Sequence, residues 1–151
     1  MRFKIIFFLL ALLYQSTSYS KALEASEFNQ KHLSSYFSAL LYYDNQKNAE
    51  ALKYFEDSKA LINNHDNFLR EYVFSLVLDG QVKKAINQIK HSKKQNFFEA
   101  NLLLILDSLT KKKYKQAENR ISKLLSYEND DTYKFVILKT LESYNYAFLY
   151  K

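Results

Sequence analysis

The stretch Ala51-Leu-Lys-Tyr-Phe55 decides the fold, because its outline returns in Ala85-Ile-Asn-Gln-Ile89 and again in Ala117-Glu-Asn-Arg-Ile121. In each stretch an alanine is followed four residues later by a large apolar residue, and the three alanines are 34 and 32 residues apart. A period near 34 is typical of paired antiparallel helices that pack on their neighbours. The sequence therefore predicts a series of helical hairpins.

The composition also favours helices over sheets. The chain has 151 residues, of which 48% are hydrophobic and 17% aromatic, with no proline and a single glycine, Gly80. The tight turns of β-hairpins and meanders depend on glycine and proline. We therefore expect one all-α domain. Cysteine is absent, so a disulfide framework and thiolate metal sites are excluded.

A polar turn precedes each repeated alanine, and an apolar segment precedes each turn. Ala51, Leu52 and Phe55 follow at the spacings that line one face of a helix. The expected first helices of the three hairpins are 34–43, 66–78 and 97–110, and the expected second helices are 49–63, 82–92 and 114–127. Segment 21–31 precedes them as a short helix or flexible leader, the repeats occupy 32–127, and a terminal segment 128–151 contains one more helix from residue 132.

The first twenty residues differ from the rest of the chain. Two basic residues precede the apolar run 5–14, and a short polar stretch follows it, which is the layout of a secretory signal peptide. Because Ser18 and Ser20 are small, we expect cleavage after Ser20 and a periplasmic or secreted product. The lysine- and asparagine-rich composition beside a short signal indicates a bacterial origin. An uncleaved anchor that tethers the chain to a membrane is the alternative, although ten apolar residues are about half of what a bilayer-spanning helix needs.

The spacing of small and aromatic residues resembles the tetratricopeptide repeat (TPR). That family has a small residue and an aromatic in the first helix, an alanine at the start of the second helix, and an aromatic four residues after it. The first hairpin matches best. The residues that match the positions at which the family's helices pack together are Ala39, Tyr42, Ala51, Phe55, Gly80, Ala85, Ile89, Tyr114, Ala117 and Ile121. Val73 and Ile105 occupy the small sites of the second and third hairpins, so those repeats are degenerate.

The resemblance implies a right-handed stack of antiparallel hairpins, a TPR-like α-solenoid of about three hairpins plus a terminal helix. A generic stack of α-hairpins is the alternative. The family's role would make the chain an adaptor or scaffold that binds a protein or peptide in a concave groove. Positions matching that groove are Tyr36, Leu40, Tyr43, Arg70, Phe74, Val77, Leu102 and Leu106. The competing interpretation of these side chains is inter-helix core.

The sequence offers little support for catalysis, metal binding or nucleic acid. His32, His65 and His91 lack metal-ligand spacing and are interpreted as surface residues near helix ends. No nucleophile motif or phosphate loop is found, so we expect no enzyme activity and no cofactor. The lysine blocks 83–84, 93–94 and 111–113 are interpreted as solvated ends of helices, where cations suit the negative pole of the helix dipole or the loop beyond it. Arginine is scarce, which argues against nucleic acid.

The terminal helix, expected over 132–151, is too apolar for the polar outer face of a capping repeat. Three interpretations are open: it folds over the open edge of the array, it is a docking surface for another chain, or it belongs to a longer array. The second and third are favoured together. Self-association through this helix is therefore one expected property of the chain.

Overall fold

The computed structural model describes residues 29–63, 65, 67–127 and 132–150, and within these ranges the regular structure is entirely helical. The expected all-α class is confirmed. The elements are α2 (Gln30–Asp44), α3 (Asn48–Asp57), the 3₁₀ helix η1 (Lys59–Asn63), α4 (Phe68–Leu78), α5 (Val82–His91), α6 (Phe98–Thr110), α7 (Tyr114–Leu125) and α8 (Thr132–Leu149). The expected signal peptide and its cleavage point lie outside the described residues, as does most of the leader 21–31.

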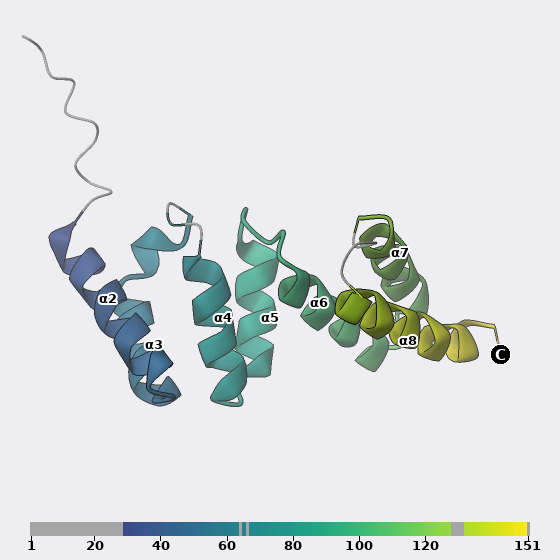
Figure 1. The fold of residues 1–151 in the computed structure, drawn as a ribbon, viewed down its shortest axis with the longest axis horizontal. Helices are drawn as coiled ribbons and strands as arrows, with labels where there is room; N and C mark the ends of the chain where they lie inside the picture. Colours follow the sequence, from purple (N-terminus) through teal and green to yellow (C-terminus); the bar gives the residue numbers. More distant parts are fainter. Residues whose placement is uncertain (1–28, 64, 66, 128–131, 151) are drawn as a thin grey trace, which may run out of the picture.

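Helices that are neighbours in the sequence are neighbours in space. Figure 1 shows them following one another along the long axis of the molecule, from α2 at one end to α8 at the other. The closest pairs are α2 with α3, α4 with α5, α6 with α7, and α7 with α8. Contact between α3 and α4 joins the first two hairpins, whereas α5 and α6 meet much more sparsely.

One turn is used three times, at the end of α2, α4 and α6. Gln46, Gly80 and Lys112 each adopt a positive φ, of 60°, 78° and 57°. Each donates its backbone N–H three residues back, and the next residue donates five residues back, as Gln81 does to Leu76 O at 2.7 Å. This pair of bonds is the Schellman motif, which satisfies the last carbonyls of a helix and reverses the chain. The three left-handed residues are 34 and 32 apart, matching the alanine period.

The residues of the repeated pattern lie mostly in the core. Seven of them are no more than 1% exposed: Ala39, Ala51, Phe55, Ala85, Ile89, Ala117 and Ile121. The half-buried Tyr42 ring stacks on Tyr54 with centroids 5.2 Å apart. Alanine at these positions lets two helices approach closely while the large residue four positions on fills the space beside it. Val73 and Ile105, at the degenerate small sites, are also buried.

The buried residues form two clusters of unequal size. Cluster one extends from α2 to the middle of α6 and is built around aromatic rings, including Tyr36, Phe55, Phe68 and Tyr72. Cluster two joins α6, α7 and α8 and has four buried members, Ile105, Ala117, Ile121 and Leu138. The core is therefore thickest at the N-terminal end of the described chain.

Two expectations about local structure are wrong. The helix expected over 49–63 ends at Asp57, because the buried Ser58 donates its hydroxyl to Tyr54 O at 2.7 Å and the chain tightens into η1. The lysine block 83–84 was expected at the negative pole of a helix, yet both residues lie in the first turn of α5. Lys84 is neutralised there by Glu56 at 2.7 Å.

Within the described ranges, none of the helices combines the length and the apolar character that crossing a membrane requires.

Candidate functional site

A depression of about 360 Å³ lies between α2 and α4, and we call it the α2–α4 pocket. Tyr43 at the end of α2 forms one wall, and Arg70 and Phe74, one turn apart on α4, form the other. Asn67 and Glu71 complete it. Three of the eight residues expected in a groove, Tyr43, Arg70 and Phe74, are thus brought together by two helices that are both first members of a hairpin.

Arg70 gives this pocket a fixed positive charge. The guanidinium carbon lies 5.8 Å from the centroid of the Phe74 ring, within the range of a cation–π contact. One guanidinium nitrogen donates to Glu99 Oε1 of α6 at 2.8 Å, which connects the second and third hairpins. The side chain remains about half exposed, so the planar donors are held in place and still face solvent.

The tyrosines around the pocket are neutral hydrogen-bonding groups. The hydroxyl of the buried Tyr36 donates to Glu71 Oε2 at 2.5 Å. Burial, together with this bond and the charge of Glu71, raises the pKa of Tyr36 far above its usual range. Partial burial and the Glu71 carboxylate also raise the pKa of Tyr43. The pocket thus presents a phenol, a guanidinium and an aromatic face beside the Glu71 carboxylate and the Asn67 amide, a set suited to binding a polar ligand.

The other expected groove residues lie elsewhere. Tyr36 is 2% exposed and belongs to the core, so it offers no open surface. Leu40 and Val77 are half-buried against cluster one, and Leu102 is half-buried on α6. Leu106 lines a separate cleft between α5 and α6. The eight residues therefore do not form one continuous groove.

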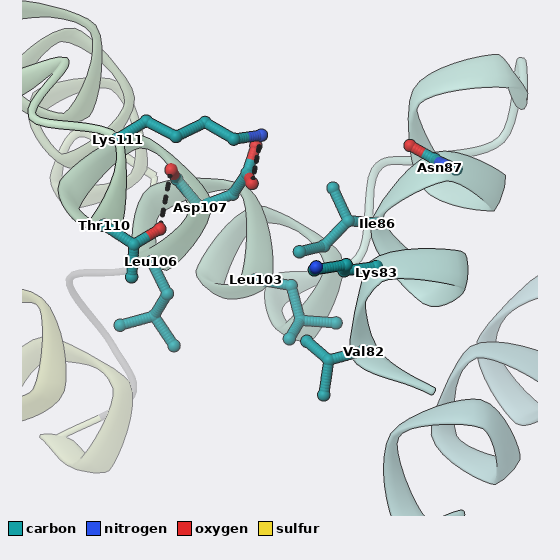
Figure 2. Close-up of a pocket in the computed structure, with 9 residues that line it drawn as sticks. All are labelled: Val82, Lys83, Ile86, Asn87, Leu103, Leu106, Asp107, Thr110 and Lys111. Atoms are coloured by element: carbon teal, nitrogen blue, oxygen red, sulfur yellow. Dashed lines mark hydrogen bonds and ion pairs between the residues drawn. The ribbon is translucent and has the colours of Figure 1, made fainter. Parts of the chain in front are cut away.

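The α5–α6 cleft has a volume of about 540 Å³ and was not anticipated from the sequence. Figure 2 shows Val82 and Ile86 of α5 on one side and Leu103 and Leu106 of α6 on the other. The side chains do not close the space, in keeping with the sparse contact between these two helices. The positions of the apolar residues in α5 and α6, considered together, could have predicted this cleft.

Asp107 holds the rim of the cleft together. Its carboxylate accepts from Lys90 Nζ of α5 at 2.7 Å and lies 2.6 Å from Lys111 Nζ at the end of α6. Hydrogen bonds from Lys111 and Lys90 hold the pKa of Asp107 below its usual range. The Thr110 hydroxyl donates to the backbone oxygen of Asp107 at 3.0 Å, as Figure 2 shows. Asp107 therefore has a structural role, because it bridges α5 to the turn after α6.

Each of the three histidines has a local structural contact. His32 Nδ1 lies 2.7 Å from Asp57 O, the His65 ring lies 4.6 Å from that of Tyr36, and His91 Nδ1 lies 2.8 Å from Asn87 O. Across the described parts of the chain, no group of three potential metal-ligating side chains is found.

No protein-family model, no curated protein and no solved structure gave a significant match to this chain. The function is therefore argued from the site itself.

Proposed function

We propose that this chain is an adaptor or scaffold with a TPR-like architecture, a right-handed α-solenoid of about three antiparallel hairpins plus a terminal helix. The support is the return, at intervals of 34 and 32 residues, of both the buried alanine and the Schellman turn. Repeated hairpins of this kind build extended surfaces that hold other proteins. The degenerate small sites at Val73 and Ile105 make the proposed array less regular than the family pattern.

The proposed ligand is a peptide segment of a partner protein, bound at the α2–α4 pocket. The single observation that carries this proposal is the half-exposed Arg70 guanidinium fixed over Phe74 and beside Tyr43. A carboxylate of the peptide would pair with Arg70, and an apolar side chain next to it would cover Phe74. Arginine and aromatic residues at a shallow pocket are the groups that most often dominate binding energy at protein interfaces.

The test begins with peptides displayed on phage and selected on protein purified from cells that express the full chain. We expect the selected peptides to share an acidic residue close to an aromatic or aliphatic one. Arg70→Ala should weaken their binding at least tenfold, which corresponds to about 1.4 kcal/mol. Tyr43→Ala should weaken it less, and Arg70→Lys should lose part of the affinity because lysine lacks the planar fork of donors.

The matched control is Lys53→Ala, which removes a positive charge from an exposed position on α3. It should leave peptide affinity unchanged. Circular dichroism of each variant shows whether the helices are intact. Equal affinity of the peptides for the wild type, Arg70→Ala and Tyr43→Ala would remove the α2–α4 pocket from consideration as the binding site.

We further propose that the adaptor acts after export, in a periplasmic or secreted location, with residues 1–20 removed. The alternative is a membrane-tethered scaffold that keeps the N-terminal segment and recruits partners at the outer face. Intact mass spectrometry after cell fractionation separates the two. A soluble product that begins at Lys21 supports export with cleavage, whereas a full-length product in the membrane fraction supports the tethered form.

A further inference from the structure

The outer side of α8 carries a regular stripe, which we call the heptad stripe. Its members, at alternating spacings of three and four, are Tyr133, Val136, Thr140, Ser143 and Ala147, continued by Tyr150 directly after the last residue of the helix. At about 100° per residue they occupy a sector roughly 100° wide, centred away from Leu138, the residue that α8 buries in cluster two. Ser143 also lies at the edge of a depression between α7 and α8. All six are exposed, with Tyr133 at 74%, Val136 at 56% and Tyr150 at 61%. Such spacing is the pattern of helices that pair along a seam.

The heptad stripe contains no charged residue, although the whole chain has a net charge of +6. The ionised side chains of α8 are Lys134, Lys139 and Glu142, and helical spacing places all three outside the stripe. Lys139 and Glu142 also pair with each other at 2.8 Å. Two copies of the stripe can therefore meet without bringing like charges together.

Two of the four hydroxyls in the stripe have partners within α8, and the Tyr150 hydroxyl donates to Glu118 Oε1 of α7 at 3.4 Å. Thr140 Oγ1 donates to Val136 O at 2.8 Å, and Ser143 Oγ donates to Lys139 O at 3.0 Å. A hydroxyl that is hydrogen-bonded to its own helix can be covered without leaving a donor unsatisfied, which removes the main cost of burying it. The centre of the stripe is thus compatible with a dry interface.

We propose that this protein forms a homodimer in which α8 packs antiparallel against α8 of a second copy, with the twofold axis between residues 141 and 142. In such a pair Thr140 lies against Ser143 of the second copy, and Val136 lies against its Ala147. Tyr133 lies against the second copy's Tyr150 at each end. Small residues therefore meet at the centre, where helices approach most closely, and rings close the ends. The antiparallel arrangement also places opposite helix dipole ends side by side.

The area available is of the size that a dimer needs. Tyr144 and Tyr146, which flank the stripe, are 55% and 62% exposed. Taking about 150–250 Å² for a whole aromatic side chain, the large residues of the stripe and its flanks expose several hundred Å² per copy. That is comparable to the roughly 800 Å² per partner of a standard interface. This inference concerns a different surface from the α2–α4 pocket and stands independently of the proposed function.

The first experiment measures the mass of the purified protein by light scattering over a range of concentrations. We expect twice the monomer mass, falling toward the monomer mass on dilution. Thr140→Glu places two carboxylates close to the twofold axis and should give a monomer with unchanged helix content. The matched control, Asn119→Glu, makes the same change of charge at an exposed position on α7 and should remain a dimer.

A charge-exchange experiment keeps the proposal falsifiable if Thr140→Glu disturbs the fold. One variant carries Thr140→Lys and Ser143→Lys, and the other carries Thr140→Glu and Ser143→Glu. Each alone should be monomeric, and an equimolar mixture should form a heterodimer. A wild type that is monomeric at 100 micromolar, as would follow if residues 5–14 of the same chain covered the stripe, overturns the proposal. A mixture that stays monomeric also overturns it.

Discussion

The two ends of the described chain pack their helices together with different kinds of side chain. In cluster one the rings of Tyr36, Phe55, Phe68 and Tyr72 lie with centroids 5.2 to 6.2 Å apart, and they tie α2, α3 and α4 into one unit. In cluster two the four buried residues are aliphatic, and α8 contributes only Leu138 to them. The two clusters meet within α6, where Leu104 belongs to cluster one and Ile105 to cluster two. Hairpins with similar sequences can therefore form hydrophobic cores of very different size.

The clusters also differ in how their tyrosines are used. Tyr36 and Tyr72 are buried, and each donates its hydroxyl to a carboxylate on another helix, Glu71 and Glu56 respectively. The tyrosines of α8 are mostly exposed, and their rings contact other rings at the surface, as in the 4.5 Å pair of Tyr146 and Tyr150. A buried tyrosine with an acceptor adds to stability, whereas an exposed one adds to binding surface. The buried tyrosines of cluster one thus contribute to stability, whereas the exposed tyrosines of α8 provide surface for binding.

The largest expected effect is the loss of Phe55. Its side chain is fully buried among three other rings, so Phe55→Ala should lower the free energy of unfolding by about 3–5 kcal/mol. The matched change at the other end, Phe148→Ala, removes a ring that is 42% exposed and should cost less than about 1.5 kcal/mol. Urea unfolding followed by circular dichroism measures both. If both substitutions lowered the free energy of unfolding by the same amount, the two clusters would not differ as described.

The next effect concerns whether the clusters unfold together. Ile121→Ala removes a buried side chain from cluster two and should cost about 2–3 kcal/mol, near the low end for such changes because a small cluster can partly collapse. Hydrogen exchange should show faster exchange of the amides of α7 and α8 while α2 to α4 keep their protection. If α2 to α4 lost protection to the same extent, the clusters would be one cooperative unit despite the cleft.

A smaller effect is expected at Glu56, which joins three helices. It accepts from Tyr72 of α4 and lies 2.7 Å from Lys84 of α5. Glu56→Ala leaves the buried Tyr72 hydroxyl without an acceptor and should cost about 1–3 kcal/mol. Glu56→Gln keeps an acceptor and should cost under about 1 kcal/mol, because the carboxylate is more than a third exposed and its ion pairs are screened.

The pH dependence of Glu56→Gln sharpens this prediction. Partial burial works to raise the pKa of Glu56, but hydrogen bonds from Lys84 and Tyr72 outweigh it, and the pKa lies below 4.5. A carboxyl whose pKa is lower in the folded state contributes stability above its unfolded pKa, and this contribution is lost as the pH falls through the folded value. The wild type should therefore lose more stability than Glu56→Gln when the pH is lowered below 4.5. Parallel stability curves for the two proteins would contradict the assignment.

The smallest effects are expected in the three repeated turns. In Gln46 and Lys112 the left-handed backbone brings Cβ too close to the backbone, which destabilises this conformation. Gly80 has no Cβ and adopts the conformation without this strain. Lys112→Gly and Gln46→Gly should each stabilise the protein by up to about 1 kcal/mol. Gly80→Ala should destabilise by a similar amount through the backbone alone, since an added Cβ would meet no atom within 4 Å. Thermal unfolding measures all three, and a stabilising Gly80→Ala would contradict the argument.

Much of the fold could be predicted from the sequence because alanine spacing and polar turns are local properties. The six expected hairpin helices and the terminal helix all have a counterpart, although the second helix of the first hairpin is shortened by Ser58. The effect of Ser58 depends on its being buried with its hydroxyl turned back to Tyr54 O. Burial of that kind is a property of the tertiary structure and is not contained in the spacing.

The candidate site could be predicted only in part. Tyr43, Arg70 and Phe74 meet because α2 and α4 occupy equivalent places in successive hairpins. Tyr36 is in the core because Glu71, 35 residues away, supplies an acceptor for its hydroxyl. Leu106 lies apart because the sequence period places residues along each helix but does not determine how far α5 and α6 separate. The heptad stripe, by contrast, is visible in the sequence once the spacing in 133–150 is counted.

The sequential packing of the helices has a consequence for how quickly the protein folds. Each helix packs mainly against a helix that is its neighbour in the sequence, across turns of a few residues. Chains dominated by such local contacts fold rapidly, because little loop-closure entropy must be lost before contacts form. The aromatic cluster of α2 to α4 can be complete before α8 has been synthesised. Assembly can therefore proceed in the direction of synthesis, with the most stable end formed first.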